Sequence, residues 1–230
     1  MQEGDPAIHE SASTDVGMME PHLSGGARER SRNGNMTTAM DIIRREKIVA
    51  AVRLESDDHL FKAVESLFRG GVKVIEIAMN TPNALRHVGK IKEKLPDAWV
   101  GVGTVLDETT ARSAIEAGAS FLLSPSLNAA AIRAANRCDI PFIPGVLTPT
   151  EMVAAYEYGA KAVKVFPIDA FGPNYLKAIS APLPQLKMIP MGGINEDNAK
   201  RYLEAGSFAL GMGSALINDR LVKDGNFAEI

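Results

Sequence analysis

The chain has 230 residues, of which 46% are hydrophobic and 23% charged, values typical of one soluble domain with a sizeable core. Its net charge of −3 and its 6% of aromatic residues give no electrostatic footprint for nucleic acid. No apolar run approaches the ~18 residues that span a bilayer. The single cysteine (Cys138) excludes an intrachain disulfide and fits a reducing, cytoplasmic compartment. No Cys/His cluster has metal-ligand spacing.

Residues 1–36 differ in composition from the rest of the chain. They hold six acidic residues and three arginines, so they carry the whole net charge, and they are rich in serine and glycine without hydrophobic periodicity. This composition predicts disorder, and it is unlike a secretory signal or a mitochondrial presequence. We therefore expect residues 1–36 to be a disordered leader or an appended extension, with one folded domain over residues 37–230.

From residue 41 onward, short apolar or β-branched runs alternate with amphipathic segments. The starts of these runs are separated by roughly 20–26 residues, a spacing suited to strand–helix units. Eight such units predict an α/β fold in which parallel strands close into a single (β/α)8 TIM barrel. The predicted strands are 47–53, 72–78, 99–105, 121–124, 141–146, 162–166, 187–191 and 208–211.

Helix-start and helix-stop signals lie between the predicted strands. Thr148–Glu151 predicts a capping box, and Thr81 followed by Pro82 predicts an N-cap with proline at the first helical position. His59 and His87 fall on predicted helices, on faces expected to be solvated, and no chemistry is assigned to them. The other predicted boundaries are the N-caps Asp107 and Asn195 and the helix-ending glycines Gly71, Gly118, Gly159 and Gly206.

Two ionisable residues lie inside predicted strands. Lys164 shares a strand face with Ala162 and Phe166, and Glu76 lies in the run 72–78; a parallel barrel strand is covered on both faces, so both residues are expected to be buried. A buried ammonium is costly unless it is paired or neutral, and a neutral amine is a nucleophile suited to Schiff-base chemistry on a carbonyl. The alternative is an internal Glu–Lys ion pair, which stabilises a fold only weakly. Two such groups in one barrel favour a functional site.

Further chemistry is expected at the carboxyl ends of the strands, where barrel active sites lie. Arg53 ends the first strand and can bind a carboxylate in bidentate fashion, although a surface arginine is the common outcome. Thr104 follows two glycines and offers a hydroxyl, or it marks a tight strand-to-loop transition. The last two strands end in glycine-rich loops that predict a phosphate cradle, or alternatively two tight turns. The cradle residues are Gly192, Gly193, Gly213 and Ser214.

Together these residues resemble the 2-dehydro-3-deoxy-phosphogluconate (KDPG) / 4-hydroxy-2-oxoglutarate (KHG) aldolase family of class I, Schiff-base aldolases. The resemblance runs in unbroken order from around residue 41 to the end, and the paired Glu76 and Lys164 motifs are specific to this family. The matching stretches are 47–50, 71–82, 101–106, 124–125, 143–146, 163–167, 190–194 and 211–216.

The resemblance implies a homotrimeric lyase that needs no cofactor and takes a small keto acid, with no nucleic-acid or membrane partner. It implies cleavage of 2-keto-3-deoxy-6-phosphogluconate or 4-hydroxy-2-oxoglutarate to pyruvate and an aldehyde, glyceraldehyde 3-phosphate or glyoxylate. Lys164 would be the Schiff-base lysine and Glu76 the general acid/base. The implied substrate-binding residues are Arg53 and Thr104 at the pyruvate carboxylate, Pro125 and Phe166 beside the imine, and Gly192, Gly193, Gly213 and Ser214 at the phosphate.

The chain departs from the family pattern at several positions. Asn80 stands where family members often carry arginine, and Met191 stands where a threonine is usual, so substrate preference is expected to differ there. Ser126 and Ala181 replace common glycines. Residues 219–230 correspond only to the beginning of the family's last helix, which is expected to be cut short.

Two other functions fit the same residues. The first is a phosphate-binding barrel isomerase or synthase without an imine, in which Lys164 is an electrostatic clamp on an anion. The second is a non-catalytic trimeric assembly module derived from the aldolase, which retains Lys164 and Glu76 without using them. The intact reactive pair and the cradle favour the lyase.

Overall fold

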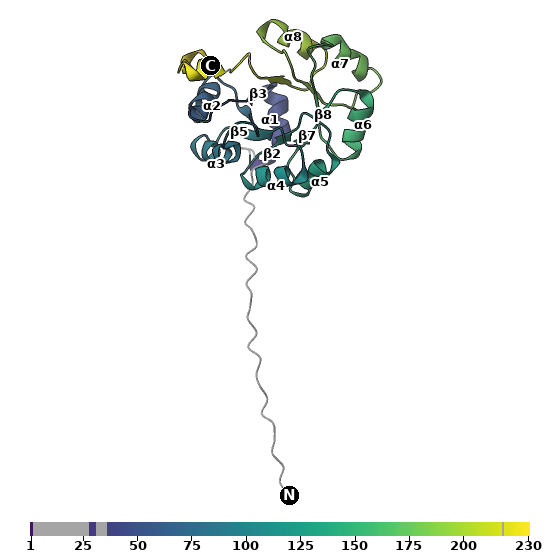
Figure 1. The fold of residues 1–230 in the computed structure, drawn as a ribbon. Helices are drawn as coiled ribbons and strands as arrows, with labels where there is room; N and C mark the ends of the chain where they lie inside the picture. Colours follow the sequence, from purple (N-terminus) through teal and green to yellow (C-terminus); the bar gives the residue numbers. More distant parts are fainter. Residues whose placement is uncertain (2–27, 31–35, 218) are drawn as a thin grey trace.

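The computed structural model describes Met1 and residues 28–30, 36–217 and 219–230 (Figure 1). Most of the predicted leader, residues 2–27 and 31–35, lies outside this part of the chain. Within it, β1 (Arg28–Arg30) pairs antiparallel with β2 (Met36–Thr38), and β2 leads directly into the first helix.

All eight predicted strands form, one of them divided into two short strands, and every pair among them is parallel. One sheet has the order β11-β3-β4-β5-β6-β7, and a second has the order β10-β9-β8. The strands are β3 (Ile48–Val52), β4 (Val74–Ala78), β5 (Trp99–Gly103), β6 (Leu122–Leu123), β7 (Phe142–Ile143), β8 (Gly145–Val146), β9 (Val163–Val165), β10 (Met188–Pro190) and β11 (Leu210–Met212).

The two sheets approach each other at both ends. The predicted strand 141–146 is divided into β7 and β8 at Pro144, which has no N–H to donate to a neighbouring strand. The Pro144 carbonyl still accepts a hydrogen bond of 2.9 Å from the Lys164 N–H. At the other end, an isolated parallel bridge joins Met191 to Gly211. The prediction of a parallel α/β fold is therefore confirmed.

The helices that follow the strands lie around them in the order of the chain, whereas the first helix lies in the middle of this view (Figure 1). In the part of the chain that the structure describes, no helix is long and apolar enough to span a membrane. The helices are α1 (Ala39–Glu46), α2 (Leu60–Arg69), α3 (Ala84–Lys94), α4 (Glu108–Glu116), α5 (Ala129–Arg137), α6 (Pro149–Glu157), α7 (Pro173–Ser180), α8 (Glu196–Glu204), α9 (Asp219–Lys223) and the 3₁₀ turn η1 (Phe227–Glu229).

Most predicted helix boundaries are confirmed. The capping box of α6 is complete, because the Glu151 N–H donates to Thr148 Oγ1 at 3.3 Å and the Thr148 N–H donates to Glu151 Oε2 at 2.7 Å. Asp107 and Asn195 cap α4 and α8 with their side chains. The four predicted glycines have φ values between 91° and 102°, in the left-handed region that other residues avoid: Gly71, Gly118, Gly159 and Gly206.

The predicted cap of α3 is wrong. The helix begins at Ala84, its N-cap is Asn83 with a φ of 53°, and Pro82 lies in the preceding turn. Thr81 closes that turn, since its N–H donates to the Ala78 carbonyl at 2.9 Å and its carbonyl accepts from Ala84 at 3.3 Å. The Thr81 hydroxyl therefore does not reach the α3 amides; it binds a neighbouring loop instead.

Removing the α6 capping box gives a first prediction. Replacing Thr148 with alanine should lower the free energy of unfolding by about 1 kcal/mol. The Glu151 N–H loses its acceptor, and the Glu151 carboxylate, which accepts from the Thr148 N–H, loses the hydrogen bond from the Thr148 hydroxyl. Urea denaturation of Thr148→Ala against Thr150→Ala measures this. Thr150 occupies the same helical turn but is not the N-cap, so its replacement should stay within about 0.5 kcal/mol of the wild type.

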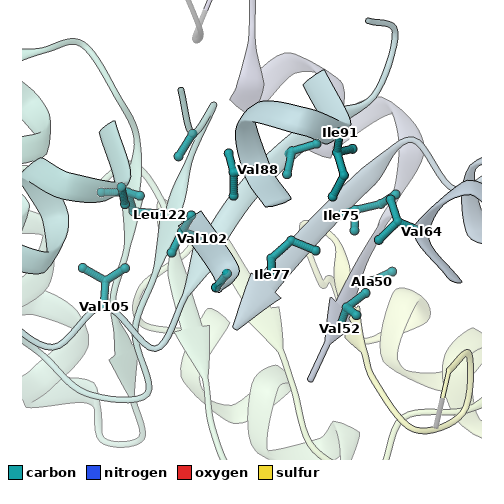
Figure 2. Close-up of a cluster of buried hydrophobic side chains, with 14 of the residues drawn as sticks. Ala50, Val52, Val64, Ile75, Ile77, Val88, Ile91, Val102, Val105 and Leu122 are labelled. Atoms are coloured by element: carbon teal, nitrogen blue, oxygen red, sulfur yellow. The ribbon is translucent and has the colours of Figure 1, made fainter. Parts of the chain in front are cut away.

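The strands separate two groups of apolar side chains. On the outer face, Ile75 and Ile77 of β4 pack against α2 and α3 through residues such as Val64 and Ile91 (Figure 2). On the inner face, Val74 belongs to a second cluster that also contains Ala162. Because side chains alternate along a strand, Glu76 and Lys164 share the inner face with Val74 and Ala162, as predicted.

Candidate active site

A cavity of about 340 Å³ lies at the carboxyl ends of β3, β4, β9, β10 and β11. Most of the predicted site residues line it, although they come from positions far apart in the sequence. The predicted residues on its wall are Arg53, Glu76, Lys164, Phe166, Gly192, Gly193, Gly213 and Ser214. The structure thus brings together the predicted lysine, carboxylate, guanidinium and glycine loops.

Glu76 is held on the inner face of β4, with only 3% of its surface exposed. Its Oε2 atom is buried and has no hydrogen-bond partner among the described residues. Burial raises the pKa of the Glu76 carboxyl, and the positive charges of Lys164 and Arg53 oppose that rise. A carboxyl whose pKa is raised by desolvation, and which has an oxygen free to bind, is suited to carry a proton for a reaction.

Glycine on the neighbouring strand makes room for this carboxylate. In the register of β4 and β5, Glu76 lies opposite Gly101 and Ala78 lies opposite Gly103. A methyl group at Gly103 would overlap the Glu76 carboxyl group. The position of the carboxylate in the cavity therefore depends on the absence of a side chain at Gly103.

Lys164 points into the same cavity from β9 and is 7% exposed. Its strand lies between β8, where Gly145 is opposite Lys164, and β10, where Ile189 is opposite it. The Nζ atom lies 4.8 Å from the centroid of the Phe166 ring, close enough for a cation–π contact. The charge of Lys164 also opposes the rise in the Glu76 pKa, so the two groups interact electrostatically across the cavity.

The residues predicted to bind anions line the same cavity. Arg53 follows the last residue of β3, is exposed, and lines the cavity. Gly192 and Gly193 have φ values of 110° and 65°, a conformation that glycine adopts without strain. A guanidinium and successive glycine amides are groups that bind carboxylates and phosphates.

Thr104 and Pro125 are not among the described residues that line the cavity. Thr104 directly follows β5 with a φ of 60°, an unusual conformation for a β-branched residue. The backbone of Pro125 lies against Gly145, where a methyl group would meet it. The contacts of Thr104 and Pro125 with a substrate therefore remain predictions from the sequence.

The residues that depart from the family pattern occupy different places. Met191 is 4% exposed, lines the cavity, and packs over Gly211, whose missing side chain leaves room for the thioether. Asn80 is exposed on a separate surface hollow beside Pro82. Met191 therefore forms part of the cavity wall, whereas Asn80 is not among the described residues that line the cavity.

Sequence reasoning missed Asp219 and misplaced His87. Asp219 lines the cavity, and its Oδ1 accepts a 3.0 Å hydrogen bond from the Glu55 N–H. His87 was expected to face solvent, but its side chain is only 12% exposed and its Nε2 lies 2.9 Å from Asp57 Oδ2. The signal was present, because position 87 follows Ala84 by three residues and so falls on the buried stripe of α3.

Comparisons with known proteins agree on one family. Residues 39–230 match the family model described as KDPG and KHG aldolase. The KHG/KDPG aldolase of Escherichia coli K12 is 33% identical over 195 residues, which cover 84% of this chain and 92% of that protein.

Two solved structures are also similar to this chain. The KDPG aldolase of Legionella pneumophila, crystallised with pyruvate captured at low pH as a covalent carbinolamine intermediate, has a TM-score of 0.78 and 30% identity, covering 84% of this chain and 94% of its own. A cube-shaped protein cage designed by fusing symmetric oligomeric domains has a TM-score of 0.72 and 28% identity, covering 80% of this chain and 70% of its own.

Proposed function

This chain belongs to the KDPG and KHG aldolase family, and on that premise we propose that it is a class I aldolase, a carbon–carbon lyase that forms an imine on Lys164. The observation that carries the proposal is the buried pair in one cavity: an inward-facing lysine and a desolvated carboxyl with an unpartnered oxygen. Support also comes from the Legionella relative, in which pyruvate is captured as a covalent carbinolamine.

In the proposed reaction, the Lys164 amine attacks the C2 ketone of the substrate and gives a carbinolamine, which loses water to form an imine. The protonated imine withdraws electrons, so the C3–C4 bond can break with its electron pair delocalised into an enamine. The ring of Phe166 and the burial of Lys164 limit the access of water to this intermediate.

Glu76 is the proposed general acid/base. Directly or through one water, its carboxylate takes the proton of the C4 hydroxyl as the aldehyde leaves, and the resulting carboxylic acid can return a proton to C3 of the enamine. Water then hydrolyses the imine, releasing pyruvate and restoring the lysine. The raised pKa of Glu76 suits this cycle, since the carboxyl must hold its proton between the two steps.

The remaining residues are assigned to binding. Arg53 holds the keto-acid carboxylate with support from Thr104, while Pro125 and Phe166 flank the imine. The glycine loops, with Gly192, Gly193, Gly213 and Ser214, hold a terminal phosphate. The substrate is 2-keto-3-deoxy-6-phosphogluconate, whose terminal phosphate the glycine loops hold, or 4-hydroxy-2-oxoglutarate, which carries no phosphate. The second product is glyceraldehyde 3-phosphate in the first case and glyoxylate in the second.

The proposal extends to architecture and setting. The strands close into an eight-stranded barrel, a reading supported by the short break at Pro144 and by the bridge between Met191 and Gly211. The protein assembles as a homotrimer, consistent with its similarity to a cage built from symmetric oligomeric domains. It functions in the cytoplasm, which suits a chain with a single cysteine.

Trapping with sodium borohydride tests this function. With pyruvate present, reduction should fix the three-carbon acid irreversibly on the protein, and peptide mass spectrometry should place it on Lys164. A second assay, coupling release of pyruvate to lactate dehydrogenase, should detect turnover with the two candidate substrates. Labelling at another lysine, or none at all, contradicts the proposal and leaves a phosphate-binding enzyme without an imine or an assembly module.

A change at Gly103 should separate imine formation from proton transfer. Gly103→Ala places a methyl group against the Glu76 carboxyl group and must displace it. We expect turnover to fall by about 100-fold, the scale of a small misplacement of a catalytic group, while pyruvate is still trapped on Lys164. Equal loss of trapping and turnover would instead indicate a general collapse of the site, which denaturation of the same sample can detect.

A further inference from the structure

Arg53 lies beyond the strand that leads to it. The ladder between β3 and β4 ends at Val52, which is opposite Ile77, so the peptide that follows Arg53 is not held by the sheet. Arg53 itself is exposed and lines the cavity. A long, exposed side chain has many rotamers. How often its guanidinium lies where it can bind a substrate therefore depends on how firmly the backbone beside Arg53 is fixed.

A buried threonine from the next loop fixes that backbone. The N–H of Leu54 donates to Thr81 Oγ1 at 3.1 Å, a buried contact between residues 27 apart in the sequence. Thr81 is 2% exposed, and Leu54 is also 2% exposed. The Thr81 N–H donates to the Ala78 carbonyl at 2.9 Å, which ties Thr81 to the end of β4, the strand that carries Glu76.

Further contacts tie the loop that follows β3 to its neighbours. Asp57 Oδ2 accepts a hydrogen bond of 3.0 Å from Asn83 Nδ2 and lies 2.9 Å from His87 Nε2. The Glu55 N–H, the next amide after Leu54, donates to Asp219 Oδ1 at 3.0 Å. These contacts are more exposed than the hydrogen bond between Leu54 and Thr81. If the Thr81 hydroxyl is removed, water cannot easily take its place at the buried Leu54 amide, so this hydrogen bond matters most for the loop.

We propose that Thr81 is a positioning residue for Arg53: its hydroxyl fixes the Leu54 amide and thereby sets the guanidinium relative to Glu76 and Lys164. This inference rests on the proposed role of Arg53 in binding the keto-acid carboxylate. Because a carboxylate is bound both before and during the reaction, loss of the anchor weakens substrate binding and leaves the chemical steps at Lys164 in place.

The test measures the pyruvate concentration that gives half-maximal borohydride trapping. Thr81→Val keeps the shape of the side chain but removes the hydroxyl, and it should raise this concentration about tenfold while maximal labelling is unchanged. Thr81→Ser, which retains the hydroxyl, should restore the wild-type value within about twofold. Thr148→Ala, which removes a hydroxyl anchor on a distant helix, controls for lost stability and should leave half-saturation unchanged.

A double-mutant cycle shows whether Thr81 acts through Arg53. In the Arg53→Ala background, Thr81→Val should have no further effect on half-saturation, since the guanidinium it positions is gone. The inference is overturned if half-saturation is unchanged in Thr81→Val, if the shift is the same in both backgrounds, or if serine fails to rescue. Failure of the proposed function is a separate result, in which the wild-type protein itself is not labelled.

Discussion

Replacement of Lys164 with alanine should abolish trapping of pyruvate and lower kcat/KM by roughly 10⁴-fold or more, because the covalent route through the imine is lost altogether. The side chain is buried and points into the cavity, where none of the other predicted site residues is an amine. Steady-state kinetics with the pyruvate-coupled assay, together with borohydride labelling, measure both effects on one sample.

Two further variants make this prediction specific. Lys164→Met retains most of the side-chain volume and should be as inactive as alanine, which separates lost chemistry from lost packing. Lys161→Ala removes an exposed lysine that lies three positions away, before the amino end of β9. It should trap pyruvate and turn over at the wild-type rate. Residual turnover in Lys164→Ala within tenfold of the wild type is incompatible with an imine mechanism.

The sequence predicts the layout of the site well because strand periodicity and chain order determine it. Lys164 and Glu76 are assigned to the inner face by the alternation of β9 and β4 alone, and the parallel strands place their carboxyl ends together. The glycine loops after β10 and β11 follow from the same rule. None of these assignments requires knowledge of which side chains touch.

Predictions that depend on contacts between loops are less successful. Thr81 resembles an N-cap in sequence, but its hydroxyl binds the Leu54 amide from the preceding loop, and this long-range partner leaves no local signal. Asp219 reaches the cavity because the last helix folds back beside Glu55, which strand periodicity does not report. His87 shows the reverse case, since the helical stripe indicates its burial and only its polarity suggests exposure.

The space around the reactive pair comes from residues that contribute almost no side chain. Ala51 is opposite Glu76 on β3, Gly103 lies beside the carboxyl group, and Gly211 accommodates Met191. A barrel interior is otherwise filled by branched side chains in layers. Small residues at these positions therefore leave a cavity beside Glu76, while the burial of its carboxyl group on the inner face of β4 raises its pKa.

Glu76→Gln should lower kcat by about 10²- to 10⁴-fold, the usual contribution of a general acid/base, while trapping of pyruvate on Lys164 continues. Glutamine has nearly the same shape but cannot take the C4 proton or return one to C3. Single-turnover cleavage and borohydride labelling distinguish the two steps. Glu157→Gln, which changes an exposed carboxylate on α6, should match the wild type in both.

The same substitution should change how stability depends on pH. Burial raises the pKa of Glu76 in the folded protein above its ordinary value of 4.5, so over the range between the unfolded and folded pKa values the folded state binds more protons than the unfolded state. The contribution of Glu76 to the free energy of unfolding therefore falls as pH rises through that range, by at most about 1.4 kcal/mol per pH unit, and levels off above it. Glu76→Gln lacks this contribution. Urea denaturation at a series of pH values should show its stability relative to the wild type increasing as pH rises from 4.5, and a relative stability that decreases with pH would mean that attraction to Lys164 and Arg53 outweighs desolvation.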